Sequence, residues 1–184
     1  MPDVPQTHNF EGGPATSSEM DTYVRDVLIF LQRRPFFELR QTVGQTIATS
    51  TGTVATFTTE DYDTDPAGTG GHSNSVNTSR WTCQYPGVYS FGGIVAWTAN
   101  ATGRRAGWWQ INGTAIAGSQ FAYPATAASD GEFVVPLIRW YFSAGDYLEL
   151  IVYHERGANL DTFAGVGATA GTRMGGIWER LDGS

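Results

Sequence analysis

Three aspartates at alternate positions, Asp61, Asp63 and Asp65, are the side chains in this sequence whose spacing best suits a cation. Carboxylate oxygens at such a spacing are the ligands that a calcium loop uses. That loop motif, however, requires glycine where Pro66 stands and glutamate where the sequence has a histidine. We therefore expect a solvated, charged surface loop over residues 60–73. We expect no metal or other cofactor, and the three aspartates remain only candidate cation ligands.

A second group combines arginine with large aromatic rings. Its members are Arg104, Arg105, Trp108, Trp109 and Tyr123. Such side chains stack on sugar rings or anchor protein contacts. Because consecutive strand residues face opposite sides, only one of Trp108 and Trp109 can lie in a core. The other must face a subunit, a ligand or water. These five residues are the candidate ligand or subunit contact; the alternative is that the rings only fill the core and a subunit interface.

Catalytic chemistry has little support in the sequence. The three histidines, His8, His72 and His154, belong to no nucleophile elbow, phosphate loop or zinc-protease motif. The single cysteine, Cys83, excludes an internal disulfide and sits in an aromatic strand pattern, as expected for a small buried hydrophobic side chain. We predict that the protein is not an enzyme and has no catalytic residues.

The elements that position these groups are organised around residues 77–97. Trp81 and Cys83 alternate with polar residues before a Tyr-Pro-Gly sequence, and Tyr89 and Phe91 alternate after it. Period-two alternation rich in aromatic residues is typical of strands. Proline cannot donate to a sheet ladder and glycine relieves the backbone at a bend. The pattern predicts two core strands that meet at a fixed corner.

Similar alternation continues along the rest of residues 36–184. The other expected strands are 37–43, 54–59, 106–111, 114–121, 133–142, 147–154 and a closing strand near 175–181. Asn112-Gly113 is a strong hairpin signal, because both central residues of a type I′ turn need positive φ. About ten strands without internal helices predict an antiparallel β-sandwich or jelly roll.

One helix is expected before this domain, within residues 16–35. Ser17 or Ser18 can cap it, and Pro35 prevents its continuation. Its apolar side chains form the candidate trimer or anchor surface: Met20, Tyr23, Val24, Val27, Leu28 and Leu31. A short helix is marginal in water, so this surface must be buried. It can pack on its own domain, form a three-copy bundle or dock into a larger assembly. Residues 1–15 are expected to be an extended arm.

Composition excludes several classes of function. The formal net charge is −7 and all 11 basic residues are arginines, so binding to nucleic acid is not expected. The N-terminal residues lack the basic and apolar regions of a signal peptide. The longest apolar run, Val27–Leu31, is far shorter than the roughly 20 residues of a membrane span. We predict no membrane insertion.

Three motifs resemble the globular head of complement C1q, which is related in fold to tumour necrosis factor. They are Arg80-Trp-Thr-Cys-Gln-Tyr-Pro-Gly-Val-Tyr-Ser-Phe91, Gln110-Ile-Asn-Gly-Thr114 and Ala144-Gly-Asp-Tyr-Leu-Glu-Leu150. They occur in the family's order, and the resemblance covers roughly residues 37–181. It implies a ten-stranded jelly roll that assembles as a homotrimer around an aromatic axis.

A second resemblance concerns residues 20–42, with Tyr-Val-Arg-Asp and Phe-Glu-Leu-Arg-Gln. This segment is similar to the start of small bacteriophage virion proteins, in which a helix precedes a similar β domain. It implies a minor tail or fibre-like virion protein, made in the host cytoplasm and attached to other virion proteins by its N-terminal segment. The jelly roll would project and bind host-surface glycan. The alternative is a capsid decoration or head fibre protein that coats the shell.

Overall fold

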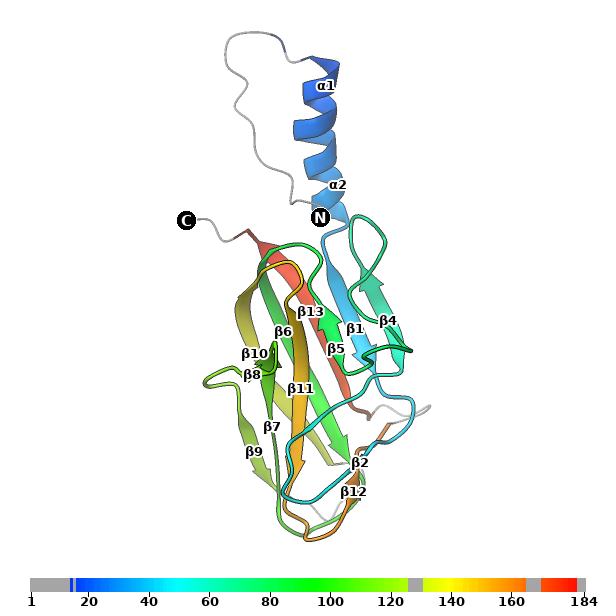
Figure 1. Ribbon diagram of the computed structural model, residues 1–184, viewed down its shortest axis with the longest axis vertical. Helices are drawn as coiled ribbons and strands as arrows, with labels where there is room; N and C mark the ends of the chain where they lie inside the picture. The colour runs from blue at the N-terminus through cyan, green and yellow to red at the C-terminus, as the bar shows by residue number, and fades with distance from the viewer. Residues whose placement is uncertain (1–13, 15, 126–130, 165–169, 182–184) are drawn as a thin grey trace.

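Two antiparallel β-sheets pack face to face, and one helix projects from an end of this sandwich (Figure 1). The computed structural model describes residue 14 and residues 16–125, 131–164 and 170–181. The predicted fold class, a mainly β jelly roll preceded by a helix, is confirmed. The described residues form thirteen strands, against about ten expected, because several two-residue strands lie in segments that were expected to be turns or parts of longer strands. The expected arm falls almost wholly outside the described residues.

Each sheet combines strands that are far apart in the sequence. The five-stranded sheet has the order β10 (Gly131–Phe142), β6 (Gly87–Trp97), β13 (Arg173–Arg180), β1 (Phe36–Arg40) and β4 (Thr59–Thr64). The six-stranded sheet has the order β3 (Thr53–Val54), β11 (Tyr147–His154), β7 (Arg104–Ile111) and β8 (Thr114–Ala115), with β5 (Arg80–Thr82) on β11 and β9 (Phe121–Pro124) on β7. A small pair joins β12 (Leu160–Asp161) to β2 (Thr46–Ile47).

The predicted corner carries the chain from one sheet to the other. Trp81 before it and Tyr89 after it are both buried, as the alternation predicted, but β5 and β6 are not hydrogen-bonded to each other. Gly87 has φ of 150°, and a Cβ there would lie 2.2 Å from the indole nitrogen of Trp178. Burial raises the pKa of the Cys83 thiol to about 12, so this cysteine is a packing residue and not a nucleophile.

One strand was mistaken for a loop. Residues 59–64 form β4, which pairs with β1 at the edge of the five-stranded sheet. Its acidic sequence lacks the alternation of apolar and polar residues that predicts a strand, because an edge strand can keep charged side chains in water. Conversely, the strand expected over 54–59 is reduced to β3 and an irregular segment, although Ala55 and Phe57 are fully buried.

The helix comprises α1 (Ser17–Met20), η1 (Asp21–Arg25) and α2 (Asp26–Gln32). Its cap is Thr16 and neither expected serine: the Thr16 hydroxyl accepts the Glu19 N–H, and the Glu19 carboxylate accepts the Thr16 N–H. The helix stands off the sandwich, and Phe30 is its only buried residue (Figure 1). No helix among the described residues is long and apolar enough to cross a membrane.

Candidate interaction surfaces

The helix presents large apolar side chains to solvent. The exposed fractions are 46% for Met20, 53% for Leu28 and 54% for Leu31, and Ile29, which was not predicted, reaches 40%. The other candidates, Tyr23, Val24 and Val27, are half-buried. This surface therefore does not fold back onto its own sheets.

Phe30, which the apolar spacing places on the outer surface of the helix, fixes the helix to the sandwich. Its ring lies edge-on to Tyr85 and Trp178, with centroid distances of 5.6 and 4.8 Å. Pro35 is buried at the start of β1, and its carbonyl accepts the Trp178 N–H at 2.9 Å. The base of the helix is thus part of the core, whereas Met20, Leu28 and Leu31 are exposed.

The outer surface of the five-stranded sheet, called here the five-stranded face, contains a shallow apolar groove of about 360 Å³. Gly92 of β6 and Gly175 of β13 are paired in register at its floor, and the absence of side chains there creates the depression. A Cβ at Gly175 would lie 2.9 Å from the Phe37 carbonyl oxygen. Its apolar walls come from Phe36, Ile94, Leu137 and Ile177.

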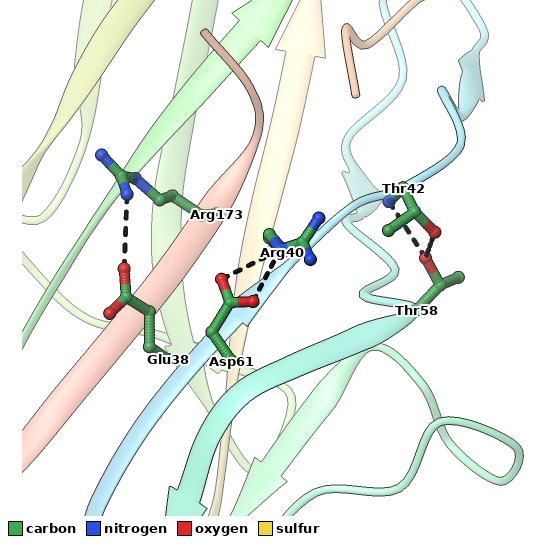
Figure 2. A network of polar contacts seen from close by, with 6 residues as sticks. All are labelled: Glu38, Arg40, Thr42, Thr58, Asp61 and Arg173. Atoms are coloured by element: carbon green, nitrogen blue, oxygen red, sulfur yellow. Dashed lines mark hydrogen bonds and ion pairs between the residues drawn. The ribbon is translucent and has the colours of Figure 1, made fainter. Parts of the chain in front are cut away.

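Charged pairs lie along one side of this groove. In Figure 2, Arg173 of β13 contacts Glu38 of β1 at 3.3 Å, and Arg40 of β1 contacts Asp61 of β4 at 2.7 Å. Farther along the same edge, the Thr42 and Thr58 hydroxyls are 2.8 Å apart (Figure 2). On the opposite side, Glu179 pairs with Arg139 at 3.2 Å. The groove is therefore an apolar strip between compensated charges.

The strand at the other edge of this sheet, opposite β4, is β10, and its exposed surface is also apolar. Its exposed side chains are Val134 at 65%, Leu137 at 63%, Trp140 at 45% and Tyr141 at 42%. Groups of exposed large hydrophobic side chains on a soluble domain mark an interaction surface. The sequence did not single out Val134 and Leu137, because a strand pattern does not reveal which strand lies at an edge.

The outer surface of the six-stranded sheet, the six-stranded face, is polar at one end. Glu149 is buried there and accepts hydrogen bonds from the Ser79 hydroxyl at 2.8 Å and the Gln110 amide at 2.7 Å. Arg80 lies beside it with its guanidinium carbon 4.0 Å from the centre of the Tyr147 ring. These residues line or support a polar pocket of about 350 Å³ that the sequence analysis did not predict.

The five candidate contact residues do not form one site. Trp109 is fully buried, and its indole N–H donates to the Pro136 carbonyl at 2.9 Å. Trp108 is half-buried on the six-stranded face, where a Cβ at Gly52 would meet its ring at 2.9 Å. The expectation that only one of the two tryptophans lies in the core is met.

The arginine candidates also separate. Arg105 is 1% exposed, and its guanidinium donates to the Asn100 and Thr102 carbonyls, each at 2.9 Å. It therefore supports a loop and is not exposed for ligand contact. Arg104 is exposed and pairs with Glu155 at 3.0 Å.

Tyr123 is 42% exposed at β9. Its ring stacks on Phe133 with a centroid distance of 5.2 Å. It lies on the strand that pairs with the first half of β7, where it is in register with Arg105 and not with the buried tryptophan.

The three aspartates are internal hydrogen-bond acceptors. Asp61 pairs with Arg40, as described above. Asp63 accepts the Gly71 and His72 N–H groups at 2.8 and 2.7 Å, and burial raises its pKa. Asp65 accepts from residues 68–70. Within the part of the chain that the structure describes, no cluster of acidic, histidine or cysteine side chains could hold a metal ion.

His154 has a defined structural role. It is fully buried, its Nε2 donates to the Ile47 carbonyl at 2.9 Å, and its Nδ1 accepts the Arg156 N–H at 3.2 Å. Burial lowers its pKa from the usual value of 6.5. The histidine is therefore neutral in the folded protein and joins β11 to β2.

No family model and no curated protein sequence matches the chain. Among solved structures, murine APRIL at pH 8.5 is similar with a TM-score of 0.57 and 11% identity, over 80% of this chain and 100% of that one. Eiger TNF from S. frugiperda gives 0.53 and 12%, over 83% and 96%. The zebrafish complement 1qA globular domain gives 0.49 and 15%, over 80% and 99%. The fold of the chain is therefore a tumour-necrosis-factor-like jelly roll.

Proposed function

We propose that this chain is a non-enzymatic, homotrimeric structural protein of a bacteriophage particle, of the minor tail or fibre-like kind. Its N-terminal arm (residues 1–15) and helix (16–35) attach it to other virion proteins. Its jelly roll (36–184) projects from the particle and binds a host-surface glycan.

The observation that carries this proposal is the projecting helix with its exposed apolar side chains. Leu28 and Leu31 are more than half exposed, whereas the sandwich has a closed core. Exposing such side chains to water is unfavourable by roughly 1.5–3 kcal/mol each, relative to burial. This supports a helix that is buried by copies of itself or by another particle protein.

The five-stranded face supports the homotrimer. Its groove is apolar and flanked by ion pairs, and the adjacent β10 edge exposes Leu137 and Tyr141. A groove beside an apolar edge suits rotational assembly, in which the edge of one copy fills the groove of the next. The complement C1q resemblance and the jelly-roll fold point to the same assembly.

Attachment through the helix can be tested with a deletion that leaves the core intact. Because Phe30 packs on Trp178, the deletion should remove residues 1–28 and keep Phe30. We expect a folded, soluble trimer by analytical ultracentrifugation that no longer joins particles in a complementation assay. A deleted chain that is monomeric would show that the helix drives trimerisation. A deleted chain that still enters particles would refute attachment through the helix.

The role of the projecting domain needs a separate assay. Purified full-length protein should bind host cells or their wall fraction in a pull-down. If it does not bind, and particles lacking the protein lose stability, the protein is a capsid decoration protein instead. The same exposed helix would serve that role.

A further inference from the structure

The polar pocket on the six-stranded face lies where three segments meet: β5, the loop after β4 and the turn before β11. Thr82 is paired in register with Tyr147, and Arg80 with Glu149, so these four side chains form a block on one face. The guanidinium of Arg80 lies over the Tyr147 ring, which holds the flat group in place. The central cation of the pocket is thus preorganised.

Arg80 is ion-paired with Glu149, but its hydrogen-bond donors are unused within the described residues. Among the described residues, its guanidinium donates no hydrogen bond, and its Nε is buried without an acceptor. Glu149 is 3.6 Å from Nε, and its two oxygens already accept from Ser79 and Gln110. A buried donor without a partner is costly, and it commonly marks a place where a ligand or water binds.

Two of the three candidate cation ligands, Asp63 and Asp65, hold the loop that forms one wall of the pocket. Asp65 and Asp63 together hold the N–H groups of residues 68 and 70–72. The Gly71 carbonyl accepts the Thr82 N–H at 2.7 Å, which ties this loop to β5. The loop therefore presents its polar groups without an ordering step on binding.

Two acidic groups near the pocket already accept hydrogen bonds from the protein itself. Asp63 binds two backbone N–H groups, and Asp146 accepts from the Ser143 N–H and the Asn112 amide, both at 2.7 Å. The pocket lining includes several neutral hydrogen-bonding side chains, among them Ser73, Asn77, Thr82 and Gln84. The amide of Asn77 makes no hydrogen bond within the described residues.

We propose that this pocket binds an acidic sugar unit, with its carboxylate on Arg80 and its hydroxyls on Asn77 and Thr82. The fork of a guanidinium matches a carboxylate with two parallel hydrogen bonds. Neutral amides and hydroxyls suit sugar hydroxyls better than they suit an apolar side chain. The inference rests on the proposed function, because the host surface would supply the sugar as part of a polymer, where several trimer sites bind together.

The test compares methyl β-glucuronide with methyl β-glucoside on the full-length protein, by calorimetry or NMR titration. We expect the glucuronide to bind with a Kd on the order of 1 mM, and the glucoside at least about tenfold more weakly. Arg80→Gln should weaken glucuronide binding about tenfold or more. Arg25→Gln, which removes an exposed arginine on the helix, is the matched control and should change nothing.

A second variant, Asn77→Gly, keeps the test valid if Arg80→Gln fails to fold. Asn77 has φ of 53°, a conformation that glycine adopts freely, so Asn77→Gly removes the amide without backbone strain. It should weaken glucuronide binding several-fold while the unfolding temperature stays near that of the wild type.

Three results would overturn the pocket assignment: equal binding of both sugars, no effect of either variant, or binding of inorganic phosphate without binding of glucuronide. Cell binding separates this inference from the proposed function. Protein that binds glucuronide but no host cells counts against the proposed function. Arg80→Gln protein that still binds host cells fully counts against this pocket as the recognition site.

Discussion

The two outer faces of the sandwich differ in what they leave unsatisfied. On the five-stranded face the charges are paired, and the groups without partners are apolar: the groove over Gly92 and Gly175 and the β10 edge. On the six-stranded face the apolar Trp108 is partly covered, and the unsatisfied group is polar: the Nε of Arg80, which is buried without a hydrogen-bond acceptor among the described residues. One face is suited to a second protein surface, and the other to a small polar ligand.

The largest expected effect is on assembly through the five-stranded face. Leu137→Glu places a charge on an apolar edge residue that is 63% exposed in the single chain. We expect trimers to become monomers of 19.9 kDa, because an unpaired charge is costly to bury in an interface. Analytical ultracentrifugation measures this directly.

Val43→Glu is the matched control, since Val43 is 71% exposed on a loop outside the groove. It should leave the trimer intact. If both variants remain trimeric, the five-stranded face is not the subunit contact, and the two faces do not differ in a role in assembly.

The next effect concerns the adjacent tryptophans of β7. Trp109→Ala removes a fully buried ring and should lower the free energy of unfolding by about 3–5 kcal/mol. Trp108→Ala, on the six-stranded face, should cost less than half as much. Urea unfolding followed by circular dichroism compares them. Equal losses would mean that Trp108 is as much a core residue as its neighbour and that this face is not open.

A pH effect should follow from the inner side of the six-stranded sheet. The pKa of His154 is lowered in the folded protein, so between the folded and unfolded values only the unfolded chain binds the proton. The contribution of neutral His154 to the free energy of unfolding is fully present above about pH 6.5 and is lost as the pH falls below that value. Unfolding temperatures measured from pH 8 to pH 5 should fall, and His154→Gln should reduce the slope. An unchanged slope would contradict this role.

The smallest effect should come from the charged border of the five-stranded face. Arg40→Gln removes an exposed ion pair with Asp61 and should change the free energy of unfolding by less than about 1 kcal/mol. Chemical denaturation checks this value. A loss of several kcal/mol would mean that these charges hold β4 on the sheet and do more than border a groove.

Sequence periodicity predicted most of the fold because its strands carry aromatic residues on one face. The β6 strand was found for this reason, and the positive φ values of Asn112 and Gly113, 51° and 77°, agree with the predicted hairpin turn. The β4 strand was missed because its side chains are charged at a sheet edge. The Arg105 contacts were missed because its acceptors are backbone carbonyl groups, which every residue has and which no sequence pattern can identify.

The sites were less predictable than the fold. The polar pocket joins β5, a loop and β11. The hydrogen-bonded residues Ser79 and Glu149 beside it are 70 positions apart in the sequence. No local pattern records that juxtaposition. The exposed helix was predicted from its apolar spacing, but Phe30, which fixes its base, looked like one more residue of that surface.

The position of β13 has a consequence for synthesis. Among the described residues this strand is the last in sequence order, yet it lies between β6 and β1 in the interior of the five-stranded sheet. While the ribosome is still making residues 173–180, β1 lacks the neighbour that connects it to the rest of the sheet. A chain that lacks β13 would therefore leave the edges of β6 and β1 open, so the five-stranded face is complete only when residues 173–180 are in place.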